Sequence, residues 1–93
     1  MSRPRTLNVR TTKEVPAKIK VRYVSDLRDD DGHKLDGCVT SANEILLEKD
    51  LLPMDRVSTL IHEVIHVAAP DLPEATVLRI EHAVFQAIKS ELK

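Results

Sequence analysis

The alternation of apolar and charged side chains along residues 18–24 predicts a β-strand. Ile19, Val21 and Tyr23 occupy every second position, and lysine or arginine stands between them. A period of two is expected for a strand with one buried face, because successive side chains point to opposite faces. Residues 6–10 are a weaker candidate for a further short strand.

Two more short strands are predicted at residues 37–40 and 44–47, on either side of a turn at residues 41–43. Before them, residues 25–36 are polar and predict a loop. The first half of the chain is therefore expected to form a small sheet.

The predicted loop contains an Asp-Asp-Asp-Gly sequence at residues 29–32, which invites comparison with calcium-binding loops. An EF-hand loop built around Gly32 would need oxygen ligands at the positions of Leu27 and Cys38. We therefore interpret this sequence as a solvated acidic turn, and His33 beside it as a surface residue.

Apolar side chains recur at helical spacing from about residue 56 to 68, around most of the circumference. This pattern predicts a helix that is largely buried. Asp55 is its candidate N-cap. We expect this helix to end before Pro70, because a proline disfavours helical backbone in the residue before it.

A second helix is predicted to start near Pro73 and to run to about Leu92. Asp71 and Glu74 have the spacing of a capping box, and Pro73 suits the first turn. Because the connection between the helices is short, we expect them to pack antiparallel. The expected apolar stripe of this helix comprises Val77, Leu78, Ile80, Val84, Phe85, Ala87, Ile88 and Leu92.

The composition is that of an ordinary globular chain, with 93 residues, 42% hydrophobic, 31% charged and a net charge of −1. We expect one domain over residues 1–93, in which residues 1–17 are a partly extended or flexible segment. The low net charge and the scarcity of aromatic residues argue against nucleic acid as a partner, and the lack of a long apolar run argues against a membrane. We therefore expect a cytoplasmic protein, whose oligomeric state the sequence does not define.

The strongest candidate for chemistry is an H-E-x-x-H motif at residues 62–66, inside the first predicted helix. Residues four apart lie on one helix face, so His62 and His66 can bind one zinc ion. Glu63 beside them can act on a water held by the metal. The plainer alternative is an amphipathic helix with two histidines at an interface.

Catalytic zinc usually takes three protein ligands, so a third must be found. Residues 67–70 are Val-Ala-Ala-Pro, which excludes the pattern H-E-x-x-H-x-x-G-x-x-H. The candidates that follow are Asp71, Glu74, Glu81 and His82. Glu74 and Glu81 share one side of the second helix because they are seven residues apart, and geometry alone does not decide between them. His82 lies at the edge of the apolar arc and is expected to be solvated.

Residues 59–66, followed by residues 70–77, resemble short zincin-like proteins that are encoded mostly by phages and mobile elements. These look like reduced gluzincins, related in architecture to ImmA-type metallopeptidases. The resemblance implies an α+β fold, with a short, mainly antiparallel sheet packed on the H-E-x-x-H helix and an antiparallel C-terminal helix. It also implies a Zn²⁺ ion and favours Glu74 as the third ligand, because Glu74 stands three residues before Val77. Glu81 is the alternative ligand.

The implied function is a zinc-dependent metallopeptidase, acting in the host cytoplasm if it is phage-encoded, with Glu63 as the catalytic residue. A peptide or protein substrate could add as a strand along an exposed sheet edge, which we expect at Ile45–Leu47. The alternative is a non-catalytic, phage-type accessory or interaction protein that keeps zinc for structure. A third hypothesis is a metal-free helical hairpin that packs on a sheet or on a second copy of the chain.

Overall fold

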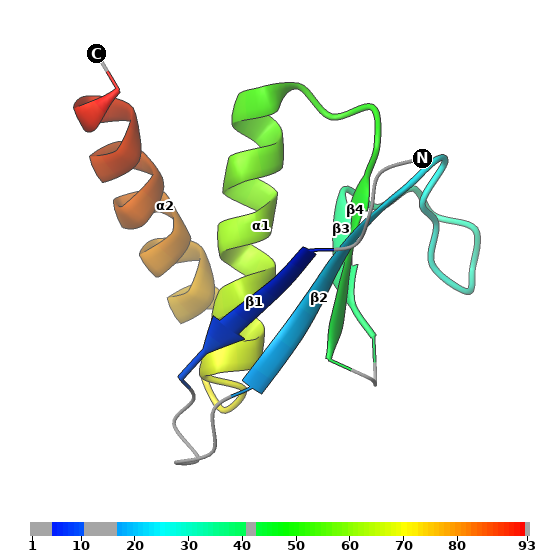
Figure 1. The fold of residues 1–93 in the computed structure, drawn as a ribbon, viewed down its shortest axis with the longest axis horizontal. Helices are drawn as coiled ribbons and strands as arrows, with labels where there is room; N and C mark the ends of the chain where they lie inside the picture. Colours follow the sequence, from blue (N-terminus) through cyan, green and yellow to red (C-terminus); the bar gives the residue numbers. More distant parts are fainter. Residues whose placement is uncertain (1–4, 11–16, 41–42, 93) are drawn as a thin grey trace.

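Four strands precede two helices in the computed structural model, which describes residues 5–10, 17–40 and 43–92 (Figure 1). The elements are β1 (Arg5–Val9), β2 (Ala17–Val24), β3 (Gly37–Val39), β4 (Glu44–Glu48), α1 (Pro53–Ala68) and α2 (Glu74–Glu91). The α+β class predicted from the sequence is confirmed.

The weak strand candidate at residues 6–10 corresponds to β1, so the N-terminal segment is extended where it is described. The rest of the segment expected to be flexible, residues 1–4 and 11–16, lies outside the described residues. The same is true of residues 41 and 42 in the predicted turn before β4.

The strands form one mixed sheet in the order β1-β2-β4-β3. The two outer pairs are antiparallel, and the central pair of β2 and β4 is parallel. The sheet is thus mainly antiparallel, as expected. The parallel pair is not indicated by the sequence pattern, because it joins strands that the loop at residues 25–36 and the strand β3 separate along the chain.

The expectation of an exposed sheet edge at Ile45–Leu47 is wrong, because β4 lies inside the sheet. Its backbone pairs with β2 on one side and with β3 on the other. Ile45 and Leu47 are fully buried, and a continuous apolar run such as this is typical of an internal strand. Within the described part of the chain, the strands with a free edge are β1 and β3.

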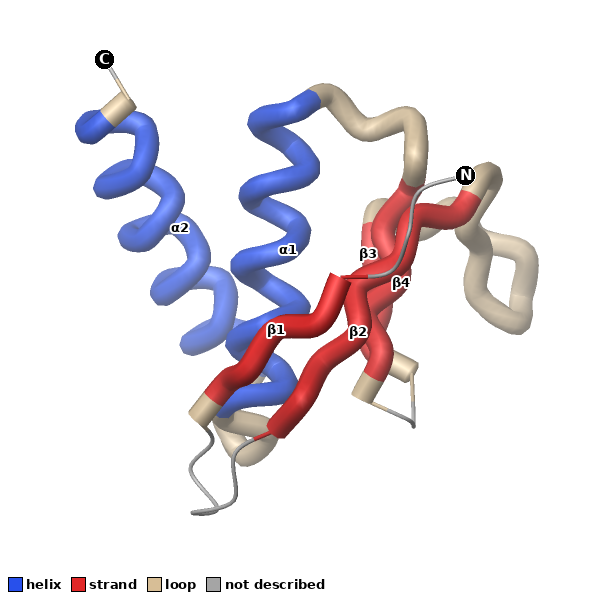
Figure 2. The backbone as a smooth tube through the Cα atoms, viewed as in Figure 1, coloured by secondary structure: helices blue, strands red, loops and turns tan. Residues whose placement is uncertain are grey.

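The core lies between the two central strands and α1. Its fully buried members, all from β2 and β4, are Ile19, Val21, Ile45 and Leu47. The residues of α1 that pack against it are Leu60, Val64 and Val67. Beyond α1 lies α2, which runs antiparallel to α1, as expected, and packs mainly against it (Figure 2). α1 is therefore the element that joins the sheet to the second helix.

The prediction of a largely buried first helix is wrong, since most of α1 is only half-buried and Glu63 is its one buried residue. On α2, Val77 is buried, but Leu78 is 50% exposed and Val84 is 40% exposed. Among the described elements, α2 packs mainly against α1, and no further layer covers its outer side. Neither helix, over the described residues, has the length and apolarity that a membrane span requires.

Neither helix has the polar N-terminal cap that the sequence predicts. α1 begins at Pro53, so Asp55 lies inside its first turn and does not cap it. α2 begins at Glu74 with Pro73 as its N-cap, and no side chain caps it by a hydrogen bond, so the capping box between Asp71 and Glu74 does not form. In both cases a proline, whose ring fixes φ near the helical value, marks the helix start in place of a polar cap.

The acidic turn before β3 is organised by its own hydrogen bonds. The backbone N–H groups of Asp31 and His33 donate to Asp29 Oδ1 over 2.9 and 2.8 Å. Gly32 adopts a φ of 84°, which glycine accepts without a steric penalty. The side chains of Asp29, Asp31 and His33 are exposed, in agreement with a solvated turn.

Candidate metal centre

The two motif histidines lie one turn apart on α1 and present the same ring nitrogen to a common point. His62 Nε2 and His66 Nε2 are 3.0 Å apart. The two rings meet edge to face, with centroids 4.7 Å apart. A regular helix brings residues four apart onto one face, so this pairing follows directly from the motif.

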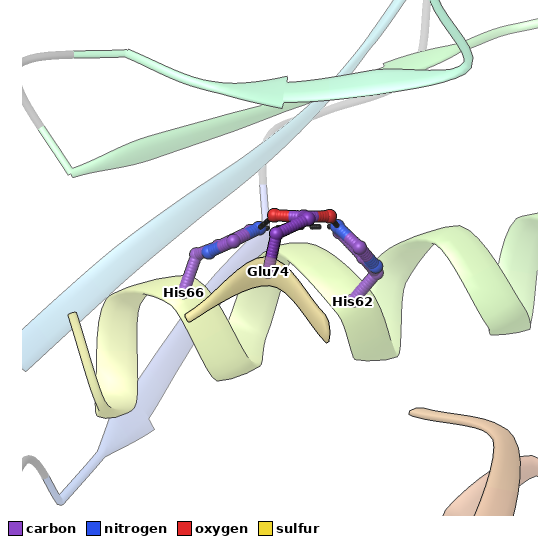
Figure 3. A group of neighbouring side chains, drawn as sticks. All are labelled: His62, His66 and Glu74. Carbon is purple, nitrogen blue, oxygen red and sulfur yellow. Dashed lines mark hydrogen bonds and ion pairs between the residues drawn. The ribbon is translucent and has the colours of Figure 1, made fainter. Parts of the chain in front are cut away.

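Glu74, the first residue of α2, completes the group (Figure 3). Its Oε1 lies 2.8 Å from His62 Nε2, and its Oε2 lies 3.0 Å from His66 Nε2. The chain reverses immediately after α1, where the Leu72 N–H donates to the Ala69 carbonyl oxygen. This tight connection places the start of α2 beside the last turns of α1.

Glu81 lies on the other side of His62. Its Oε1 accepts a hydrogen bond from His62 Nδ1 over 2.7 Å, and its Oε2 accepts one from the Ser58 hydroxyl over 2.8 Å. The two glutamates therefore have different contacts. Glu74 lies beside the Nε2 atoms of both histidines, and Glu81 contacts only His62, at Nδ1. Ser58 was not identified from the sequence, although its position four residues before His62 places it on the same helix face.

When both imidazoles are neutral, this group holds fewer protons than its acceptors require. A neutral imidazole has one N–H, and donation from His62 Nδ1 to Glu81 leaves a lone pair at Nε2. That lone pair faces a Glu74 oxygen at 2.8 Å, which is repulsive unless a proton or a metal cation lies between the two atoms. A set of two imidazole nitrogens and one carboxylate is a donor set that zinc accepts.

The spacing of the donor atoms is also close to that of a zinc site. Bonds of about 2.0–2.1 Å at tetrahedral angles place neighbouring ligand atoms roughly 3.3 Å apart. The donor atoms of His62, His66 and Glu74 lie 2.8 to 3.0 Å apart, so small side-chain rotations would open the group to that size. The other sequence candidates, Asp71 and His82, are exposed and belong to no such group.

Glu63 is buried next to the histidines, with 9% of its surface exposed. Burial raises the pKa of its carboxyl group, and the neighbouring His62 and His66 act in the opposite direction with a smaller effect. No other described residue makes a hydrogen bond or an ion pair with it. Its oxygens are therefore available to accept a proton from a water or a substrate.

A cavity of about 330 Å³ lies beside His62 and Glu63. Its other lining residues are Asp36, Gly37, Asp55, Ser58, Thr59 and Glu81. Gly37 is the first residue of β3. Its lack of a side chain allows β3 to approach α1, because a Cβ atom there would lie 2.6 Å from Thr59 Cγ2. Asp36 and Gly37 were not identified from the sequence, since only the packing of β3 on α1 brings them to the motif.

Comparisons of the chain with protein-family models, with curated proteins and with solved structures found no match. Because a fold can host many functions, the chemistry has to be derived from the site itself. The helical hairpin supplies the donor group, and β3 with the loop before it supplies one wall of the adjoining cavity.

Proposed function

We propose that this chain is a zinc-dependent metallopeptidase with a zincin-like fold, in which His62, His66 and Glu74 bind zinc and Glu63 is the general base. One observation carries the proposal: two imidazole nitrogens and a carboxylate from two helices lie within 3.0 Å of one another, beside a buried carboxylate that has no hydrogen-bond or ion-pair partner among the described residues. The H-E-x-x-H helix packed on a small sheet supports the resemblance to reduced gluzincins.

Zinc held by this group would supply Lewis-acid chemistry, polarising a substrate carbonyl and making water acidic near neutral pH. Glu63 takes the proton of the attacking water and passes it to the leaving amine. Glu81 fixes the orientation of His62, so that Nε2 stays directed at the ligand group. Glu74 contributes a negative charge that neutral histidines lack.

The free edge of β3 is the best position for a peptide substrate. Gly37, the first residue of β3, lines the cavity beside Glu63, and β3 pairs with a described strand on one side only. An extended peptide could pair with this edge as an added strand. This replaces the edge that the sequence placed at Ile45–Leu47.

The test combines metal analysis with a change at Glu63. Protein purified without chelator should contain about one zinc per chain. Glu63→Gln keeps the shape of the side chain and should retain zinc, but it should slow the hydrolysis of a peptide library by about 10²–10⁴-fold. His66→Ala, which removes a ligand, should lose both zinc and hydrolysis.

Two outcomes would contradict the proposal in different ways. Less than about 0.2 zinc per chain, without a thermal shift on adding zinc, would exclude the metal site. Bound zinc without hydrolysis in the wild-type protein would instead favour the alternative, a non-catalytic interaction protein with a structural zinc site.

A further inference from the structure

We propose that the cavity beside Glu63 binds a basic side chain, lysine or arginine, of the peptide substrate. This inference rests on the proposed peptidase function and names the class of substrate residue that this site takes. It follows from the charge of the cavity wall, from the burial of one carboxylate in it and from its size.

Four carboxylates line the cavity: Asp36, Asp55, Glu63 and Glu81. No lysine or arginine of the described residues lines it, although the chain as a whole has a net charge of only −1. Asp36 and Asp55 form no ion pair with another described residue. The charges of Asp36 and Asp55 are therefore not paired within the described protein, whereas Glu81 contacts His62 and Ser58.

The deepest of these groups supplies a second, independent reason for a cationic ligand. Glu63 is nine-tenths buried, lines the cavity and has no polar partner among the described residues. Glu63 therefore adds to the negative potential of the cavity. A cationic group held by the outer carboxylates Asp36 and Asp55 would be attracted to it without occupying the oxygens that accept a proton from water.

The size and lining of the cavity favour an organic cation. At about 330 Å³ it is far larger than the ~30 Å³ that one water molecule occupies. Its lining contains no aliphatic or aromatic hydrocarbon side chain, so an apolar substrate residue would gain little there. In the described part of the chain, no three of its carboxylates come close enough to hold one metal ion. Dispersed carboxylates suit an ammonium or a guanidinium group, which donates several hydrogen bonds in different directions.

The position of the cavity is also suited to a side chain next to the scissile bond. The cavity adjoins both Glu63 and the first residue of the free-edge strand, Gly37. Since successive side chains of an added strand alternate between two faces, a residue paired beside Gly37 could direct its side chain toward Asp36 and Asp55.

The inference can be tested by NMR titration of the zinc-loaded protein with the blocked tripeptides Ac-Ala-X-Ala-NH2, where X is lysine, arginine, norleucine or glutamate. Norleucine matches the lysine stem but lacks the charge. We expect lysine and arginine peptides to shift the backbone amides of Gly37, Ser58 and Thr59, and to bind about tenfold more tightly than the norleucine peptide.

Two matched double variants show whether the cavity carboxylates are responsible for the preference for lysine. Asp36→Asn with Asp55→Asn should weaken binding of the lysine peptide by about 2- to 30-fold, the range for two exposed charge pairs. Asp30→Asn with Asp31→Asn removes the same charge from the loop between β2 and β3 and should leave binding unchanged. Equal binding of the lysine and norleucine peptides, no measurable binding, or equal losses in both double variants would overturn the inference.

A hydrolysis assay with the same peptides separates the two proposals. Cleavage that is indifferent to the charge of X would leave the peptidase function standing and overturn the basic-residue cavity. Cavity-dependent binding of the lysine peptide without cleavage of any peptide would support the cavity and contradict the peptidase.

Discussion

At the scale of single residues, Glu74 and Glu81 differ in the nitrogen of His62 that each approaches. Glu74 faces Nε2 and Glu81 accepts from Nδ1. The sequence predicts His62, Glu63 and His66 as a group, because their spacing is set within one helix. It cannot rank the two glutamates, because they share a helical angle, and their level along α1 depends on the turn between the helices.

The different contacts predict different losses of zinc affinity on substitution. Glu81→Gln keeps the size of the side chain but weakens its hold on the His62 ring, and we expect zinc to bind about 10–100-fold more weakly. Glu74→Gln removes a charged ligand and should cost more. Competition with a chromophoric zinc chelator measures both. His82→Gln, a change at the exposed neighbouring position, serves as the control. A larger loss for Glu81→Gln than for Glu74→Gln would reverse the two roles.

At the scale of elements, local periodicity was sufficient to predict β2, α1 and α2. Each follows from a pattern within one stretch of chain, with a period of two or of about 3.6. The interior position of β4 was missed, because strand order depends on pairing between distant segments. The start of α2 near Pro73 was predicted, but the polar caps predicted for both helices do not form, and Pro53 and Pro73 mark the helix starts instead.

Because β3 packs closely on α1, we expect a side chain at position 37 to lower the stability of the protein. In Gly37→Ala the new Cβ would lie 2.6 Å from Thr59 Cγ2, and we expect a loss of about 1–3 kcal/mol in the free energy of unfolding. Thr59→Ser removes the clashing methyl group, so adding it to Gly37→Ala should restore part of the loss. Urea denaturation of the single and double variants measures the coupling.

Gly32→Ala provides a matched control for this coupling. A Cβ at Gly32 meets nothing within 4 Å, but the residue has a φ of 84°, so the substitution should cost about 1–2 kcal/mol through the backbone alone. Thr59→Ser should not restore that loss. Equal restoration of both alanine variants would show that the contact between β3 and α1 is not the cause.

At the scale of the whole molecule, Glu48 at the end of β4 connects the loop at residues 25–36 to the sheet through hydrogen bonds. It is 4% exposed, and it accepts hydrogen bonds from the Leu27 N–H, from Lys34 Nζ and from the Asp50 N–H, over 3.0, 2.8 and 3.2 Å. The Lys34 ammonium, followed by the Leu27 N–H, lowers the pKa of Glu48 from 4.5 to about 2. The same loop ends at Asp36, on the cavity wall.

The lowered pKa predicts how the stability of the molecule depends on pH. Because Glu48 holds its proton less tightly when folded, its ionised form stabilises the protein above its ordinary pKa of 4.5. This contribution is lost as pH falls from 4.5 through about 2.

The measurement compares the wild-type protein with Glu48→Gln by urea denaturation over a pH series. Contributions from the metal-binding residues occur in both proteins and cancel in the difference. The difference in the free energy of unfolding should be constant above about pH 5 and should shrink below it. A difference that persists unchanged down to pH 2 would contradict the assigned role of Glu48.

The parallel pairing of β2 with β4 also sets the order in which the chain can fold. Lys20 pairs with Glu44, so the central contact of the sheet requires closure of a long loop, whereas the β3–β4 hairpin and the helical hairpin form from neighbouring segments. Long-range contacts of this kind slow folding relative to local ones. The joining of β2 and β4 is therefore the expected rate-limiting step, and α1 gains its full apolar support only after it. The cavity, whose wall includes Asp36 and Gly37, would then become ordered later than the donor group, which lies within the helical hairpin.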